Sequence, residues 1–474
     1  MTPQALPVAL ELRERFAFLP ALVEEMERRV PYASALAMSS DGVNISLRDG
    51  EQQASRRDPR AGIVLTASNG TFLEEEATSE TTEVAVREAA ERLVARAAAR
   101  RAQTAAGSKE LRIEPGEALN GDFATEVMIS PASLSLAQKL ERYEGLRQKL
   151  RTLDPRIIQA TGRFTDGVDT KLFVNRSKMV TESVARVQAF LTVFVADGAQ
   201  RRYDWLSVGG TGGLERAEVS REQLEEMRDT ALMLLEATPV PPGTYDVVTD
   251  PGVTGVLAHE AFGHGVETDM FLKERARGAE YVGKRVGSDL VTIIDDPTVP
   301  GAYGSYFIDD EGQRASTTTI IKDGILQRGI SDLYSATQLG IARSANGRRE
   351  SFERKAYARM SNTFFAAGTS TPEEVLGSLD DGLYLCRASS GMEDPKGWGI
   401  QIATHFAREY KGGKPTGTVY APIAITGYVP DLLNDVTMVA NDFELHPGGC
   451  GKGWKEYIVV ADGGPHLRTR VRLG

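Results

Sequence analysis

The sequence predicts an α+β fold: an N-terminal mixed α/β domain followed by a C-terminal, mainly antiparallel β domain that carries an internal metal-binding helix. Three observations predict it. Helix-like and strand-like patterns alternate in the first half of the 474 residues, short strands with hairpin turns fill the second half, and a proline-rich segment at 237–246 separates the two. Three prolines between Pro239 and Pro242 cannot continue a helix. We therefore expect domains at 1–240 and 241–474.

The first domain is predicted to open with a helix over 5–29. Apolar residues between Val86 and Ala97 recur at steps of four, three and four, which places one helical face within 81–106. The same patterns and their turn signals predict the remaining elements: strands at 33–38, 43–50 and 62–70, a helix at 136–150, strands at 157–165, 170–175 and 180–197, and a helix at 221–236.

The second domain is predicted mainly from strand and turn signals. Runs at 317–321 and 325–328 flank Asp323-Gly324, a strong hairpin signal. A short helix is expected near Thr371, with Pro372 at its first position and acidic residues in its first turn. Further strand-like runs lie at 400–404, 418–427, 435–441, 456–462 and 467–473.

Composition excludes several classes of function. With 41% hydrophobic residues the chain can bury a core, and a net charge of −11 argues against a main function in binding nucleic-acid backbones. No run approaches the ~18 apolar residues of a membrane span, so we expect no membrane partner. The two cysteines, Cys386 and Cys450, give no disulfide framework, so a reducing cytoplasm is the expected location.

The segment 251–267 carries the residues with the clearest chemistry. Asp250 can cap a helix that starts at Pro251 and continues through an apolar run. On this helix lie His259, Glu260 and His264, spaced H-E-x-x-x-H. The zinc-peptidase motif H-E-x-x-H is one residue shorter and uses its glutamate as general base.

The longer spacing has a geometric consequence. At about 100° per residue, positions i and i+4 differ by about 40°, whereas i and i+5 differ by about 140°. An undistorted helix would therefore point the two imidazoles apart. We expect a π-type bulge, or a helix end loosened at Gly263 and Gly265, to bring them together.

The alternative interpretation is two core histidines beside a surface acid. Histidine is scarce here, five in 474 residues, and an unpaired glutamate is costly to bury in an apolar helix, so a metal site is favoured. A catalytic zinc takes three protein ligands and leaves one position open. The residue types leave several candidates for the third ligand: Glu267, Asp269, His405, His446 and Cys450. Thiolate suits zinc, although a small buried residue in a turn would also explain Cys450.

Several segments together resemble a known family. They are HEAFGHGVE at 259–267, FIDDEG at 307–312, NGRRES at 346–351, ARMSNTFF at 358–365 and GGCGK at 448–452. Their form and order are similar to the TldD/PmbA metallopeptidases, on the metal-bearing TldD side. The resemblance implies a zinc ion held by His259, His264 and Cys450, with Glu260 as general base.

The resemblance also implies partners and a substrate class. It implies a cytoplasmic peptidase that cuts unfolded or extended peptides, as a homodimer or as a heterodimer with a metal-less TldE/PmbA-type paralogue. The segment 391–409 departs from the glycine-rich pattern of other members. We expect this departure to affect substrate specificity more than chemistry.

Other polar residues have both functional and structural interpretations. Arg348 and Arg349 could bind a peptide carboxylate or stabilise an oxyanion, or they could form structural ion pairs. His446 could support the nearby Cys450. The acids at 309–311 could receive a substrate amino group or form an Asx-type turn. Two other functions remain open: a peptide-binding or maturation subunit with a structural metal, and a zinc amidase acting on small substrates.

Overall fold

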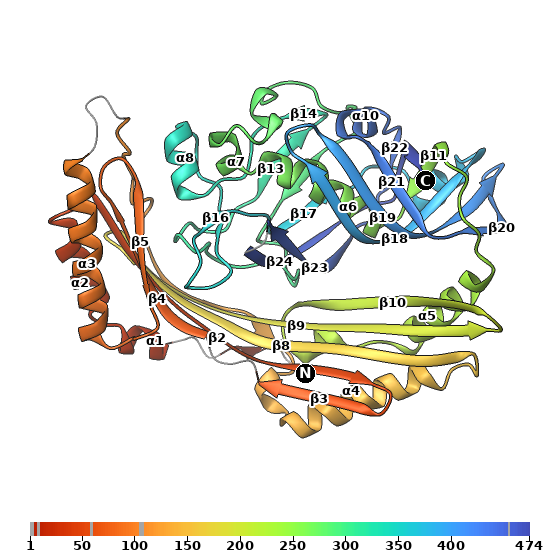
Figure 1. Cartoon of the computed structure of the whole chain (residues 1–474), viewed down its shortest axis with the longest axis horizontal. Helices are drawn as coiled ribbons and strands as arrows, with labels where there is room; N and C mark the ends of the chain where they lie inside the picture. Colours follow the sequence, from red (N-terminus) through yellow and green to blue (C-terminus); the bar gives the residue numbers. More distant parts are fainter. Residues whose placement is uncertain (1–3, 7–9, 57–59, 104–108, 454–455) are drawn as a thin grey trace.

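A long, curved sheet forms the first half of the chain (Figure 1). The computed structural model describes residues 4–6, 10–56, 60–103, 109–453 and 456–474. The strand order is β10-β9-β8-β2-β4-β5, with β3 paired to β2 and β6 paired in parallel to β9. The strands are β2 Tyr32–Arg48, β3 Glu51–Arg56, β4 Arg60–Ser68, β5 Leu73–Thr78, β6 Leu119–Ala124, β8 Ile157–Asn175, β9 Lys178–Asp197 and β10 Gln200–Thr211.

The helices of this half pack on the sheet through apolar faces. They are α1 Leu10–Arg15, α2 Leu19–Glu27, α3 Glu83–Ala102, α4 Leu136–Arg151 and α5 Arg221–Met233. The prediction of one helix over 5–29 is wrong, because a short strand β1 (Gln4–Ala5) and two separate helices lie there. Pro20 falls in the first turn of α2, where a missing N–H costs nothing. The strand runs predicted within 33–50 and 157–175 are the continuous strands β2 and β8.

In the second half, one sheet closes on itself. Its order is β11-β18-β19-β21-β25, and β25 pairs again with β11. Only the β11–β18 pairing in this ring is parallel, so the predicted mainly antiparallel architecture is confirmed. The strands are β11 Gly243–Thr249, β18 Asp381–Asp394, β19 Gly399–Lys411, β20 Lys414–Tyr420, β21 Ile423–Tyr428, β22 Met438–Val439 and β25 Leu467–Leu473.

A second sheet of this half has the order β14-β13-β12-β17-β24-β23. Its β13–β14 hairpin confirms the predicted turn, with φ of 48° at Asp323 and 76° at Gly324. The strands are β12 Ile293–Asp295, β13 Thr318–Lys322, β14 Ile325–Leu326, β17 Asn362–Phe365, β23 Glu444–Lys452 and β24 Glu456–Gly464. The short elements are β7 Glu126–Val127, β15 Gly347–Arg348, β16 Tyr357–Ala358, α7 Thr268–Leu272, α8 Leu333–Leu339, α9 Pro372–Gly377 and α10 Val429–Asn434.

Helix α6, Pro251–Phe262, lies between these two sheets. It contacts β18 and β19 of the closed sheet and β17, β23 and β24 of the other (Figure 1). A Cβ at Gly255 would lie 2.3 Å from the backbone nitrogen of Gly463, so glycine lets the helix approach β24 closely. The predicted internal helix is therefore present, and its side chains are mostly buried.

The segment 307–312, which belongs to the second half of the chain, packs against the large sheet of the first half. The Glu182 carboxylate accepts hydrogen bonds from the backbone N–H groups of Phe307 (2.6 Å) and Ile308 (2.8 Å). Lys171 donates to the Ile308 carbonyl at 2.6 Å. The first large sheet ends at Thr211, and the strands of the second half begin with β11 at Gly243. Within the described residues, no helix combines the length and apolar character that crossing a membrane requires.

Candidate metal centre

The end of α6 brings its two histidines to one side. The Asp250 carboxylate caps the helix by accepting from the Val253 N–H at 2.8 Å. The helix ends at Phe262, and a 3₁₀ turn over His264–Val266 follows Gly263. A Cβ at Gly263 would lie 1.9 Å from the Met360 sulfur. Glycine is therefore needed where the helix tightens, and this change of pitch replaces the 140° separation of an undistorted helix.

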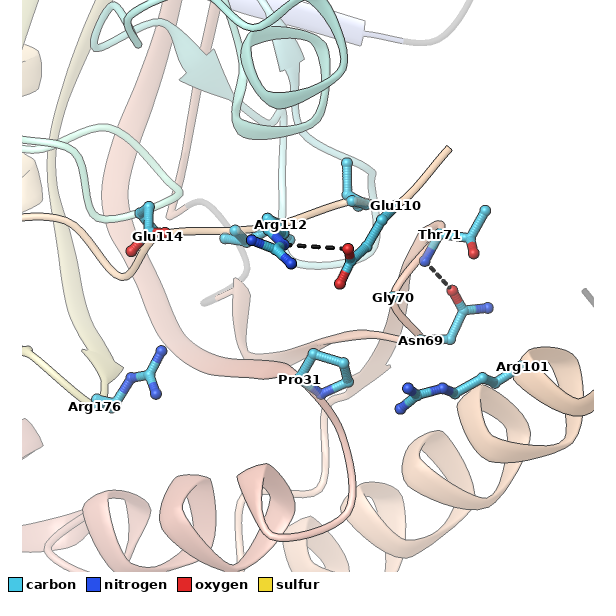
Figure 2. A pocket seen from close by; sticks show the side chains of 11 residues that line it. Pro31, Asn69, Gly70, Thr71, Arg101, Glu110, Arg112, Glu114 and Arg176 are labelled. Atoms are coloured by element: carbon cyan, nitrogen blue, oxygen red, sulfur yellow. Dashed lines mark hydrogen bonds and ion pairs between the residues drawn. The ribbon is translucent and has the colours of Figure 1, made fainter. Parts of the chain in front are cut away.

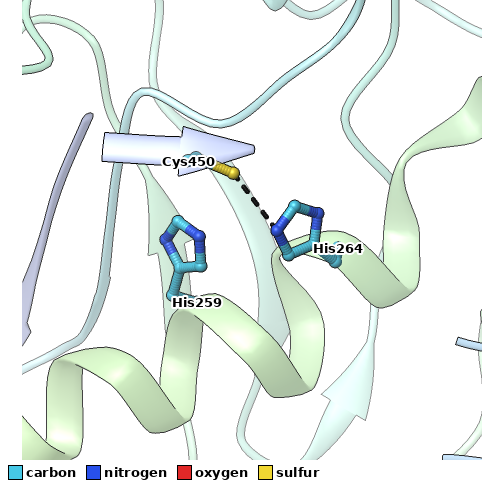
Figure 3. A group of neighbouring side chains, drawn as sticks. All are labelled: His259, His264 and Cys450. Carbon is cyan, nitrogen blue, oxygen red and sulfur yellow. Dashed lines mark hydrogen bonds between the residues drawn. The ribbon is translucent and has the colours of Figure 1, made fainter. Parts of the chain in front are cut away.

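Three side chains converge at this point. The ligand atoms of His259, His264 and Cys450 all lie within 4.8 Å of one another (Figure 3). The Cys450 Sγ is 3.1 Å from His264 Nε2, and the two imidazole centroids are 5.1 Å apart. Cys450 comes from β23, where it pairs with Ile458 of β24. Strand β23 thus supplies the third donor, in addition to His259 of α6 and His264 of the 3₁₀ turn that follows α6.

The chemistry of these donors fits a zinc ion. Imidazole and thiolate are both ligands that zinc binds, and three protein ligands are the number that a catalytic zinc site uses. Among the described residues, no fourth His, Cys, Asp or Glu joins the cluster, which matches a site that keeps one position open. His259, His264 and Cys450 would hold the ion.

Glu267 lies behind His264. Its Oε2 is 3.4 Å from His264 Nδ1 and 3.0 Å from Lys452 Nζ, and Arg359 Nε is 3.4 Å from its Oε1. Burial opposes its charge, but Lys452 and His264 lower the pKa of Glu267 to about 2. This anionic carboxylate is placed to orient the His264 ring, as carboxylates behind metal-bound histidines do. On the other side, Asp462 Oδ2 lies 3.8 Å from His259 Nδ1.

The other candidates for the third ligand lie outside the cluster. Asp269 binds Lys452 at 2.6 Å, and His405 Nε2 lies 3.0 Å from the Tyr203 carbonyl oxygen in the first sheet. His446 is half-exposed and lies opposite Asp462 in the β23–β24 register. It is not one of the clustered ligand groups.

Glu260 follows the first histidine and is buried. Burial raises the pKa of its carboxyl, against the opposing effect of His259 and His264. No group in the described part of the chain makes a hydrogen bond or ion pair with it. A Cβ at Gly391 would lie 2.4 Å from Glu260 Cγ, so β18 passes directly against this side chain. The carboxyl is free to take part in proton transfer.

The two arginines have partners within the protein. The Arg349 guanidinium donates to Glu75 Oε1 at 2.7 Å, across the two halves of the chain. Arg348 donates to the Met360 carbonyl and lies 5.0 Å from the centroid of the Tyr306 ring. The structure does not place either guanidinium in the cluster of ligand atoms. The acids at 309–311 form a turn, in which the Asp309 carboxylate accepts backbone N–H groups.

Three features of the centre escaped sequence analysis. Strand β18, which brings Gly391 against Glu260, was not predicted, although its first residues read as a strand after an Asp-Gly turn signal. Asp462 and the orienting position of Glu267 depend on pairing between distant segments. No local pattern carries that information.

A separate pocket of about 450 Å³ lies beside the β4–β5 turn and the end of α3 (Figure 2). Arg101 and Arg176 border it, and Arg112 pairs with Glu110 at 3.1 Å. It shares no lining residue with the metal cluster.

Metal occupancy should fall on acidification. Burial favours neutral His264, but the Cys450 thiolate and Glu267 outweigh it and raise the pKa of His264 well above its usual value. An imidazole must lose its proton to bind zinc, so protons compete with the metal at His264 and occupancy at a fixed zinc concentration falls as the pH is lowered. Zinc content after dialysis over a pH series measures this. Occupancy that stays flat down to about pH 5 would contradict it.

Comparisons with known proteins show which sequences and folds this chain is similar to. The family model described as PmbA/TldA metallopeptidase C-terminal domain matches residues 242–472. A protein of Methanothermobacter thermautotrophicus named a metalloprotease is 31% identical over 464 residues, covering 96% of this chain and 97% of that one. A metalloprotease TldD homolog of Haemophilus influenzae is 30% identical, covering 72% and 76%. The crystal structure of TldE from Thermococcus kodakarensis shares the fold, with a TM-score of 0.72, 16% identity and coverage of 96% and 99%.

Proposed function

Because the chain belongs to the TldD/PmbA metallopeptidase family, we propose that it is a zinc-dependent peptidase that hydrolyses unfolded or extended peptides. The convergence of His259, His264 and Cys450 beside the unpaired carboxyl of Glu260 carries this proposal. A structural zinc would need a fourth protein ligand, and the described residues supply three. A peptide-binding subunit with a structural metal is therefore the weaker alternative.

The chain's own residues can move the proton that hydrolysis requires. When bound, zinc would polarise the scissile carbonyl and lower the pKa of a water molecule. Glu260 takes the proton of the attacking water and passes it to the leaving amine. Glu267 orients the imidazole of His264, and Asp462 lies 3.8 Å from His259 Nδ1.

Strand β23 offers a way to hold the substrate. It carries Cys450, pairs with β24, and is the edge strand of its sheet among the described residues. An extended peptide can add to such an edge through main-chain hydrogen bonds, which depend little on side-chain sequence. A folded protein cannot present a free strand in this way.

The enzyme should therefore cut an unfolded protein and leave its native form intact. In a stable domain, native structure lowers the population of exposed extended segments by a factor of about 10³ or more. We expect the cleavage rates of the unfolded and native forms to differ by at least this factor. Cleavage of one protein, native and reduced–denatured, at equal concentration measures this. Equal rates would reject strand addition in favour of an open cleft that accepts folded loops.

We also propose the setting in which this peptidase works. Both cysteines are unpaired, which suits the reducing cytoplasm expected from their number. The family resemblance implies a dimer, formed either with a second copy or with a metal-less TldE/PmbA-type paralogue, and we propose that assembly here. Enclosure of the β23 edge in such a dimer would strengthen the selection against folded proteins.

A further inference from the structure

The β18–β19 hairpin runs beside the metal centre. Three contacts fix its direction: the Arg387 N–H donates to Asp250 at the start of α6 (2.7 Å), Gly391 lies against Glu260, and the Trp398 indole lies 3.9 Å from where a Cβ of Gly265 would stand. Strand β18 therefore runs parallel to α6, from the helix start to the turn that carries His264. Its residues form one wall of the site.

Glu393 lies on the wall beyond Glu260. It is two residues after Gly391, and no irregularity in the β18–β19 register separates them. Side chains two apart in a strand share a face, about 7 Å apart. Glu393 therefore faces the same side as Gly391, further along β18 toward His264. Its side chain is partly buried and still reachable from solvent.

This carboxyl has no counter-ion in the described part of the chain. Glu267, by comparison, is neutralised by Lys452 and Arg359. Neither Glu393 nor Glu260 forms an ion pair among the described residues. Burial, offset in part by His264, and the nearby Glu260 raise the pKa of Glu393 to about 8, as expected for a carboxyl that lacks a cationic partner.

The hairpin that carries Glu393 is anchored. Trp398, at its turn, is buried, with its ring centroid 4.6 Å from that of Tyr281 and 5.7 Å from that of Phe262. The Trp398 carbonyl accepts from the Val429 N–H at 2.9 Å. Aromatic packing at one end and Gly391 against Glu260 at the other hold the intervening carboxyl in place.

We infer that Glu393 is a specificity residue that binds a positively charged group of the peptide close to the bond that is cut. The inference rests on the proposed peptidase function and names its substrate class. A substrate ammonium or guanidinium would supply the missing counter-ion in a partly dry site, where charge-assisted hydrogen bonds are strong. The cation could be the free amino terminus of the peptide or a lysine or arginine side chain, and the experiment distinguishes these sources.

The test compares peptides that differ in one positive charge. Lysine is exchanged for norleucine at successive positions around the cleaved bond, and each peptide is made with a free and an acetylated amino terminus. We expect kcat/KM of the zinc-loaded enzyme to be at least about tenfold higher with the cation at one position, the size typical of a hydrogen bond to a charged group. Glu393→Gln should abolish this preference, whereas cleavage of the norleucine peptides should stay within about threefold.

Asp394→Asn is the matched control. It removes the same charge from the next residue, whose exposed side chain points to the other face of the strand. The charge preference should persist in this variant. Glu393→Lys provides a second test, because it should favour a glutamate over a lysine at the selected position.

A binding measurement separates this inference from the proposed function. In a Glu260→Gln background, fluorescence anisotropy should show the lysine peptide binding about tenfold more tightly than the norleucine peptide, and Glu393→Gln should remove the difference. The inference would be overturned if the lysine and norleucine peptides of every pair bound equally well and were cut equally fast. It would also be overturned if Glu393→Gln lowered the cleavage of the lysine peptide and the norleucine peptide by the same factor. If charge-dependent binding occurs but the wild-type enzyme cuts no peptide, only the proposed catalysis fails.

Discussion

Replacement of Glu260 by glutamine should abolish peptide turnover and leave the zinc in place. Glutamine has nearly the same shape as glutamate but cannot accept the proton of the attacking water. General-base catalysis contributes roughly 10²–10⁴ to the rate, so kcat should fall by at least that factor. Steady-state cleavage of an unfolded polypeptide, with zinc content measured on the same sample, gives both quantities.

The variant is informative because of where Glu260 lies. Its carboxyl is not one of the clustered ligand groups, and no described residue depends on it for an ion pair. A loss of activity with full zinc content therefore identifies a proton-transfer role. Retained turnover with full zinc would refute the assignment of Glu260 as general base.

Replacement of Cys450 by serine should have the largest effect on the metal. A serine hydroxyl is a poor zinc ligand, and only the two imidazoles would remain from the cluster. Loss of a residue that only orients a ligand lowers metal affinity by roughly 10–100-fold. Loss of the ligand itself should lower zinc affinity by well over this factor. Competition with a chelator of known affinity measures the change, and peptide turnover should fall in proportion to bound zinc.

Glu267→Gln is the matched comparison. An amide at this position can still contact His264 and Lys452, and all three clustered ligand groups remain. This variant should therefore keep most of its zinc under conditions that strip Cys450→Ser. The reverse order, with zinc lost on changing Glu267 and kept on changing Cys450, would identify the carboxylate as the ligand.

The features of the centre that depend on residues adjacent in the sequence could be predicted from the sequence. The Asp250 cap, Pro251 and the apolar run predict α6, and the glycines after Phe262 indicate where the regular helix must end, although the structure has a tighter 3₁₀ turn there and not the loosened end that we expected. The role of Cys450 came from the family resemblance, since several residue types could have served as third ligand. The structure then places its sulfur beside His264, 186 residues away in the sequence.

What the sequence did not reveal depends on long-range pairing. Strand β18 was missed, and with it the positions of Gly391 and Glu393, because their significance arises only where the strand passes α6. The segment 391–409 was nevertheless identified as atypical, and it forms the wall that carries Glu393. Arg349 shows the same limit: its partner, Glu75, is 274 residues away, so its local motif could not distinguish an ion pair from substrate binding.

The most direct test of the proposed function is a zinc titration of the metal-free protein, followed by its rate of cleavage of an unfolded polypeptide. We predict no cleavage without metal, a linear rise in rate as zinc is added, and a plateau at one zinc per chain, since the described residues form one cluster of His259, His264 and Cys450. Cleavage by the metal-free protein, or no cleavage once one zinc per chain is bound, would contradict the proposal that this centre is the catalytic site of a zinc peptidase.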